Sequence, residues 1–148
     1  MASLGRYLLA ACGLAAVLLG VLAAVYVSGF GRHDAASDVS RSRKTANGLF
    51  MVSIEPEKGA VRQGELHAWL VTVTTAAGQP VEYAAIDVSG GMPEHNHGLP
   101  TSPQVTDYLG NGHYRIEGMK FTMRGWWQLR LSISAEAGSD TVVFNLAL

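Results

Sequence analysis

Hydrophobic and polar residues alternate along most of the chain after residue 47, with a period of two that is typical of half-buried strands. The clearest example is the segment 125–134, which places apolar side chains on one face and polar ones on the other: Trp127, Leu129, Leu131 and Ile133 against Gln128, Arg130 and Ser132. No stretch of this region shows the 3.6-residue period of an amphipathic helix. The pattern therefore predicts an all-β domain.

Seven short strands are expected, separated by turns rich in Gly, Pro and Asn: 48–54, 65–75, 84–90, 103–109, 113–119, 125–134 and 140–148. The dipeptide Asn111-Gly112 is a strong signal for a tight hairpin. Strands spaced about ten residues apart favour an antiparallel β-sandwich. A small barrel would give nearly the same pattern.

The beginning of the chain has a different pattern. Residues Tyr7 to Phe30 include no charged side chain and are mostly Leu, Ala and Val. A helix rises about 1.5 Å per residue, so this stretch is long enough to cross a hydrocarbon core of roughly 30 Å. We expect one N-terminal transmembrane helix within residues 1–30. A cleaved signal peptide is the alternative, with Val27-Ser28-Gly29 as a weak cleavage site.

Residues 31–47 are small, polar and mixed in charge, and they predict a flexible linker between the span and the domain at 48–148. Arg6 before the span favours a cytoplasmic N-terminus, whereas the positive-inside rule applied to the other flank favours a cytoplasmic domain, since that flank holds Arg32, Arg41, Arg43 and Lys44. The basic linker residues are also able to contact anionic lipid head groups.

Composition narrows the chemistry of the domain. The single cysteine, Cys12, falls in the apolar segment, so a metal bound by the domain must use His, Met, carboxylate or backbone groups. From Gly48 onward there are six Lys or Arg and ten Asp or Glu, a formal charge of −4. A nucleic-acid-binding domain usually has a basic excess, so we expect no nucleic-acid partner.

The residues 90–100, "GGMPEHNHGLP", hold the best candidates for chemistry. If the segment is extended, His95 and His97 point to the same side and are able to grip one ion. Imidazole suits copper, zinc or nickel, and the thioether of Met92 favours reduced copper. Met119 and Met123 are expected at the same end of the sandwich. The simpler interpretation is a polar turn with exposed histidines, and the residue types alone leave both open.

Enzyme signatures are poor. The chain has no phosphate-binding P-loop, no dinucleotide-binding glycine motif and no G-x-S-x-G nucleophile turn. We therefore expect no enzymatic activity.

Three motifs in order resemble the YtkA-like and FixH-like family of bacterial membrane-anchored domains: Met92-Pro93-Glu94-His95-Asn96-His97-Gly98, Gly112-His113-Tyr114 and Met123-Arg124-Gly125-Trp126. Their combination is far more specific than two histidines alone. The resemblance covers about the last two-fifths of the domain closely, and the N-terminal apolar segment agrees with the family's layout.

The resemblance implies an immunoglobulin-like sandwich on the outer face of the bacterial cytoplasmic membrane, in the periplasm. It also implies copper handling or assembly of respiratory oxidases, with a copper-acceptor protein or a membrane complex as partner. Carried over by position, the copper ligands would be Met92, His95, His97, Met119 and Met123. FixH-type proteins have a differently organised N-terminal part, so their pathway does not transfer directly. A structural or interaction subunit without a metal is the alternative. No oligomeric state follows from the sequence.

Overall fold

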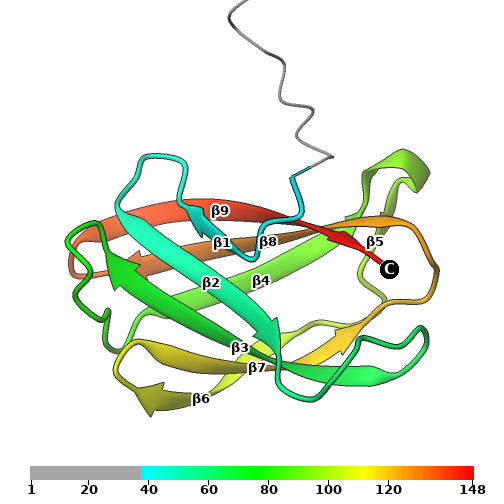
Figure 1. Ribbon diagram of the computed structural model, residues 1–148, viewed down its shortest axis with the longest axis horizontal. Helices are drawn as coiled ribbons and strands as arrows, with labels where there is room; N and C mark the ends of the chain where they lie inside the picture. The colour runs from blue at the N-terminus through cyan, green and yellow to red at the C-terminus, as the bar shows by residue number, and fades with distance from the viewer. Residues whose placement is uncertain (1–37) are drawn as a thin grey trace, which may run out of the picture. The chain divides into compact units, whose positions relative to one another are not determined.

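The computed structural model describes residues 38–148, which fold into two antiparallel β-sheets packed face to face (Figure 1). The strand order is β1-β2-β3-β7-β6 in the first sheet and β5-β4-β8-β9 in the second. The strands of the first sheet are β1 Ser42–Lys44, β2 Phe50–Pro56, β3 Leu66–Thr75, β7 His113–Lys120 and β6 Gln104–Gly110. Those of the second are β5 His97–Gly98, β4 Ala85–Met92, β8 Trp126–Ala135 and β9 Gly138–Ala147. The expectation of an all-β antiparallel sandwich is confirmed.

The core lies between the sheets and follows the alternation in the sequence. Phe50, Val52 and Ile54 on β2 are buried, and so are the four apolar residues predicted to face inward on β8. At one end of the sandwich an aromatic cluster closes the core: the Phe121 ring lies 6.3 Å from that of Trp69 and 5.3 Å from that of Trp127, both edge-on. Such pairs add to the stabilisation that comes from burial alone.

The predicted hairpin at residues 111–112 is present between β6 and β7. Asn111 (φ 51°) and Gly112 (φ 73°) both adopt left-handed backbone angles, as the tight turn requires. A side chain at Gly112 would also strike the carbonyl oxygen of Val73 in β3. This turn therefore needs glycine for its backbone angle and for its packing.

The sandwich begins earlier than the boundary expected at residue 48. Within the segment interpreted as a linker, Ser42–Lys44 forms β1 and pairs with β2. Thr45 is buried, and its hydroxyl donates to the carbonyl oxygen of Phe50. The Asp140 carboxylate accepts hydrogen bonds from the backbone N–H groups of Asn47 and Leu49. These partners lie more than ninety residues apart in the chain, so local composition gave no sign of them.

The expected span within residues 1–30 lies outside the described residues. Among residues 38–148, no helix has the length and apolar character to cross a membrane.

Candidate metal site

The histidine segment follows a strand whose glycines are required by close packing. Gly90 and Gly91 lie within β4, not in a loop, and β4 runs between β5 and β8. A Cβ atom on Gly90 would overlap the carbonyl oxygen of Gln128, and one on Gly91 would overlap that of His97. The glycine pair thus lets two neighbouring backbones approach, and it holds the segment after it against the sheet.

A turn, not an extended strand, brings the two histidines together. Pro93–His95 forms one turn of 3-10 helix, with proline at its start where no backbone N–H is needed. Asn96 then adopts the left-handed conformation (φ 52°, ψ 36°), which asparagine tolerates better than most residues. The chain reverses, and His97 pairs with Met92 across β5 and β4. The expectation of an extended segment from His95 to His97 is wrong, although its consequence, two neighbouring rings, is retained.

The rings of His95 and His97 are nearly parallel, with their centroids 6.4 Å apart and their planes 20° apart. Both side chains are exposed, and no hydrogen bond from the rest of residues 38–148 holds either ring. A metal–nitrogen bond is about 2.0–2.1 Å long. Two such bonds, with the bonding nitrogen of each ring turned inward, span a separation of this size. The pair is therefore able to hold one ion when its side chains rotate so that one nitrogen of each ring faces the ion.

The pair is not a complete metal site by itself. Within residues 38–148 no group of three or more His, Cys, Asp or Glu side chains converges. Glu94 directly precedes His95 in the sequence and is exposed. Any further donor must come from a thioether, a backbone oxygen, water or another molecule. A copper ion held here would keep open coordination positions.

The three candidate methionines lie at the same end of the sandwich but below the surface of the turn. Met92 is 2% exposed and Met119 is fully buried, and both belong to the hydrophobic core. Met123 is half-buried and packs against that core. A Cβ on Gly125 would lie 3.1 Å from the Met92 methyl carbon, so Met92 packs beneath the turn between β7 and β8. Ligation by these thioethers stays a prediction.

The turn between β7 and β8, which lies beneath the histidines, is held by several hydrogen bonds. Gln63 donates its side-chain N–H to the carbonyl oxygen of Thr122 at 2.7 Å, and the backbone N–H of Gly64 donates to Phe121 at 2.8 Å. The indole N–H of Trp127 donates to the Met123 carbonyl oxygen at 3.1 Å. The loop between β2 and β3 therefore braces the methionine-bearing turn between β7 and β8 through these hydrogen bonds.

The other histidines are engaged elsewhere. His67 Nε2 lies 2.9 Å from the backbone oxygen of Arg62 and 3.1 Å from its backbone nitrogen. His113 Nδ1 lies 2.9 Å from the hydroxyl of Thr72. Both are hydrogen-bonded histidines within strands of the first sheet, His67 in β3 and His113 in β7. The structure brings only His95 and His97 together among the histidines of residues 38–148.

Beside the histidine turn lies a hollow of about 340 Å³ on the outer face of the second sheet. Asn96 and His97 form part of its wall, and Gln128 and Arg130 of β8 form the opposite part. Alternation along the chain places Arg130 only on the polar face of its strand. Its position beside the histidine turn depends on the pairing of β4 with β8, which alternation does not reveal.

The fold and the site define a class of small all-β sandwich domain that has an exposed pair of imidazoles on a turn at one end. The model of the YtkA-like family matches residues 43–132, and the chain belongs to that family. No curated protein matches. A solved structure with a similar fold is that of a DUF4426 family protein from Pseudomonas aeruginosa PAO1, with a TM-score of 0.54 and 17% sequence identity. The alignment covers 74% of this chain and 96% of the other, and it supports the fold alone.

Proposed function

We propose that this protein is a membrane-anchored, extracytoplasmic copper-binding module with an immunoglobulin-like sandwich. The observation that carries the proposal is the His95–His97 pair, two exposed rings whose centroids lie 6.4 Å apart on one turn. Imidazole is a good ligand for oxidised copper, and thioethers favour the reduced ion. The methionines just below the turn therefore provide a reason to prefer copper over zinc.

An open site of this kind suits transfer. Only two donors are exposed at the turn, so an acceptor protein is able to add its own ligands before the first ones dissociate. A site closed by four protein ligands would hold the ion for structural purposes instead. The chain therefore serves copper handling or oxidase assembly by passing the ion on, as the family resemblance implies.

The test is a copper titration of the purified full chain. We expect about one copper ion per chain. The variant His95→Ala/His97→Ala should lose copper binding, because it lacks both imidazole ligands. The matched control is His113→Ala, which removes an exposed histidine on β7 and should titrate like the parent. Equal titrations of the double variant and the parent would refute the copper function.

A second candidate is an interaction subunit without a metal. At the end of the sandwich opposite the histidine turn, Tyr83 is 80% exposed and Leu109 is 54% exposed. The Tyr83 ring packs against that of Tyr108 at 4.7 Å, and Tyr83 has an unusual left-handed backbone angle (φ 51°). Exposed aromatic groups of this kind often contact other proteins.

Co-purification of the tagged full chain from membranes distinguishes the two. A partner that is retained by His95→Ala/His97→Ala and lost by Tyr83→Ser/Leu109→Ser would favour the interaction subunit. A partner lost only by the histidine variant would favour copper transfer.

A further inference from the structure

The outer face of the second sheet and the neighbouring strand β1, at the edge of the first sheet, together carry positive charge that is only partly balanced locally. Arg130 on β8 and Lys44 on β1 are exposed, and no carboxylate of residues 38–148 lies within ion-pair distance of either. Arg43 is paired with Asp38 at 3.3 Å. The remaining acidic residue of this face is Asp87, which lies opposite Ser132. The cations Arg43, Lys44 and Arg130 outnumber the carboxylates Asp38 and Asp87 on this face by one, whereas the domain from Gly48 onward has a formal charge of −4.

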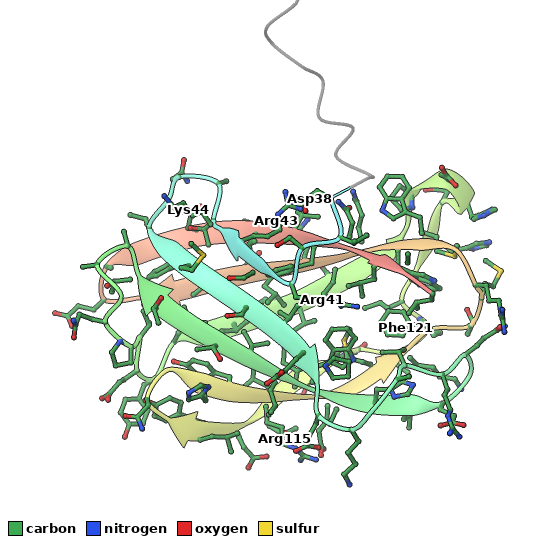
Figure 2. All side chains as sticks on the ribbon, viewed as in Figure 1. Asp38, Arg41, Arg43, Lys44, Arg115 and Phe121 are labelled. Carbon is green, nitrogen blue, oxygen red and sulfur yellow. The ribbon has the colours of Figure 1, made fainter. Side chains whose placement is uncertain are left out.

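The outer face of the first sheet is different. There Arg115 forms ion pairs with Glu57, Asp107 and Glu117. Hydrogen bonds to Glu57 raise the pKa of Arg115, and the same contact lowers the pKa of Glu57. Figure 2 shows Arg115 on the side of the molecule opposite Arg43 and Lys44. Balanced charge on one sheet and unbalanced charge on the other give the domain two electrostatically distinct faces.

The cationic side chains line two adjoining hollows. The hollow beside the histidine turn, about 340 Å³, shares Gln128, Arg130 and Val143 with a second hollow of about 400 Å³. Arg43 and Lys44 line the second one. Arg130 lies between them and contributes to both. The face is therefore indented, with room for small anionic groups around a central guanidinium.

Asp38, the first residue that the structure describes, also lies at this face. The side-chain amide of Asn145, on β9, donates to the backbone oxygen of Asp38 at 3.0 Å. Figure 2 shows Asp38 on the same side of the molecule as Arg43 and Lys44. Seven residues, 31–37, separate Asp38 from the apolar segment 1–30. Even a fully extended chain spans at most about 3.3–3.6 Å per residue, so their reach is about 25 Å.

We propose that this cationic face, made by Arg43, Lys44 and Arg130, docks onto the anionic phospholipid head groups of the membrane that anchors the chain. The inference rests on the proposed anchor. With the proposed anchor, a tether of this length keeps the domain within about 25 Å of the lipid surface, and the chain enters the domain beside its cationic face. Basic residues near an anionic bilayer are attracted to it, and phosphate oxygens match guanidinium and ammonium donors.

Docking would orient the histidine turn relative to the membrane. His97 lines the same hollow as Arg130, so the His95–His97 pair lies at the rim of the docked face. Copper would then be presented close to the bilayer surface. An acceptor embedded in the membrane is the kind of partner that this orientation serves.

The test uses the full chain reconstituted in vesicles. Cys12 is replaced by Ser, and Ser89→Cys provides a labelling site on β4, directly opposite Arg130. A fluorophore at this site should be quenched by quencher-labelled head groups more strongly in phosphatidylcholine vesicles containing phosphatidylglycerol than in phosphatidylcholine alone. Added salt should reduce the difference, because it screens exposed charges.

Neutralisation of the face gives the decisive comparison. Each basic residue near an anionic surface strengthens binding about fivefold, so Arg43→Gln/Lys44→Gln/Arg130→Gln should weaken docking on the order of 100-fold. The matched control, Lys58→Gln/Arg62→Gln/Lys120→Gln, removes the same number of charges elsewhere and should leave the quenching unchanged. A label at Thr106→Cys, on β6 of the other sheet, should be quenched little in any vesicle.

Three results would overturn the proposal: quenching that does not depend on anionic lipid, quenching that the triple variant retains, or a full chain that does not insert into vesicles. A fourth result would identify an acidic protein segment, and not lipid, as the partner of the cationic face. In that case the quenching would not depend on anionic lipid, and the chain would bind polyglutamate. Only the cationic-face variant would lose this binding. The copper titration is independent of these outcomes. The cationic-face variant should still bind copper, and His95→Ala/His97→Ala should still dock.

Discussion

Asp140 shows how much of this fold depends on one side chain. Its carboxylate accepts hydrogen bonds from the backbone N–H groups of Asn47, Leu49 and Thr141 and from the side-chain amide of Asn47. Burial raises the pKa of Asp140, but the Thr45 hydroxyl and the backbone N–H groups of Thr141, Asn47 and Leu49 outweigh this effect, and the pKa falls from 3.8 to about 2. The charged carboxylate thus joins the segment after β1 to the start of β9.

The lowered pKa predicts a specific loss of stability in acid. The folded-state pKa lies below the unfolded value, so the contribution of Asp140 is complete above pH 4 and is lost as the pH falls toward 2. The variant Asp140→Asn should be less stable than the parent at neutral pH and should lose less stability over this acid range. Urea unfolding midpoints at several pH values measure this. Parallel pH profiles would show that Asp140 is not responsible.

Variants at Met119 distinguish a packing role of this side chain from a role as a copper ligand. It is fully buried, so Met119→Leu, which nearly conserves volume, should cost less than about 1.5 kcal/mol, whereas Met119→Ala should cost about 2–5 kcal/mol. If the histidines are the dominant ligands, Met119→Leu should also keep the copper affinity of the parent. Chemical unfolding and copper titration of the two variants provide the measurements. A folded Met119→Leu variant with weakened copper binding would make the thioether a ligand.

At the scale of elements, the histidine turn depends on the narrow spacing of β4 and β5. Gly91 faces Gly98 across these strands, and a side chain on Gly91 would overlap the carbonyl oxygen of His97. The position of the turn is therefore set by backbone contact as well as by Pro93 and Asn96. Asn96 and Pro93 were visible signals of a turn in the sequence. The residue alternation used to place both histidines on one side did not apply to this segment.

Gly91→Ala tests this dependence. The added methyl group should push β5 away from β4, destabilise the fold by about 1–3 kcal/mol and weaken copper binding by moving His97. The matched control is Gly98→Ala, because a Cβ on Gly98 would meet only the carbonyl oxygen of Gly90, at 3.8 Å. Thermal unfolding and copper titration of both variants check the prediction. Equal copper affinity in the two variants would show that the turn does not rely on this contact.

For the molecule as a whole, β1 completes the sandwich at its N-terminal edge. It pairs with β2, and Arg41 just before it lies over the Trp69 ring at 5.0 Å. The backbone N–H of Ala46 donates to the carbonyl oxygen of Thr141, which joins the two sheets at this edge. The segment that composition assigned to a linker is thus part of the folded domain.

Truncation provides the test at this scale. A chain beginning at Gly48 lacks β1, Thr45 and Asn47, so it leaves the edge of β2 unpaired and removes partners of Asp140. Its melting temperature should be lower than that of a chain beginning at Asp38 by more than about 5 °C. It should also self-associate more readily, since an unpaired strand edge is a template for aggregation. Equal melting temperatures would place the true boundary at residue 48.

The sequence alone determined seven strands of the sandwich but not β1 or β5, and it determined the inward faces of β2 and β8 and the hairpin at Asn111-Gly112. These are local properties, because alternation with period two and a left-handed Asn-Gly pair need no information from distant residues. The motifs from Met92 to Trp126 were also sufficient to indicate the family that the match over residues 43–132 confirms.

Only the tertiary structure decided which side chains meet. The pairing of β4 with β8 brings Arg130 beside the histidine turn, and the contact of Asp140 with Asn47 extends the domain into the expected linker. Burial separates the core methionines Met92 and Met119 from the exposed His95–His97 pair. Each of these depends on residues that are distant along the chain and are joined by sheet pairing or packing, so no local pattern encodes them.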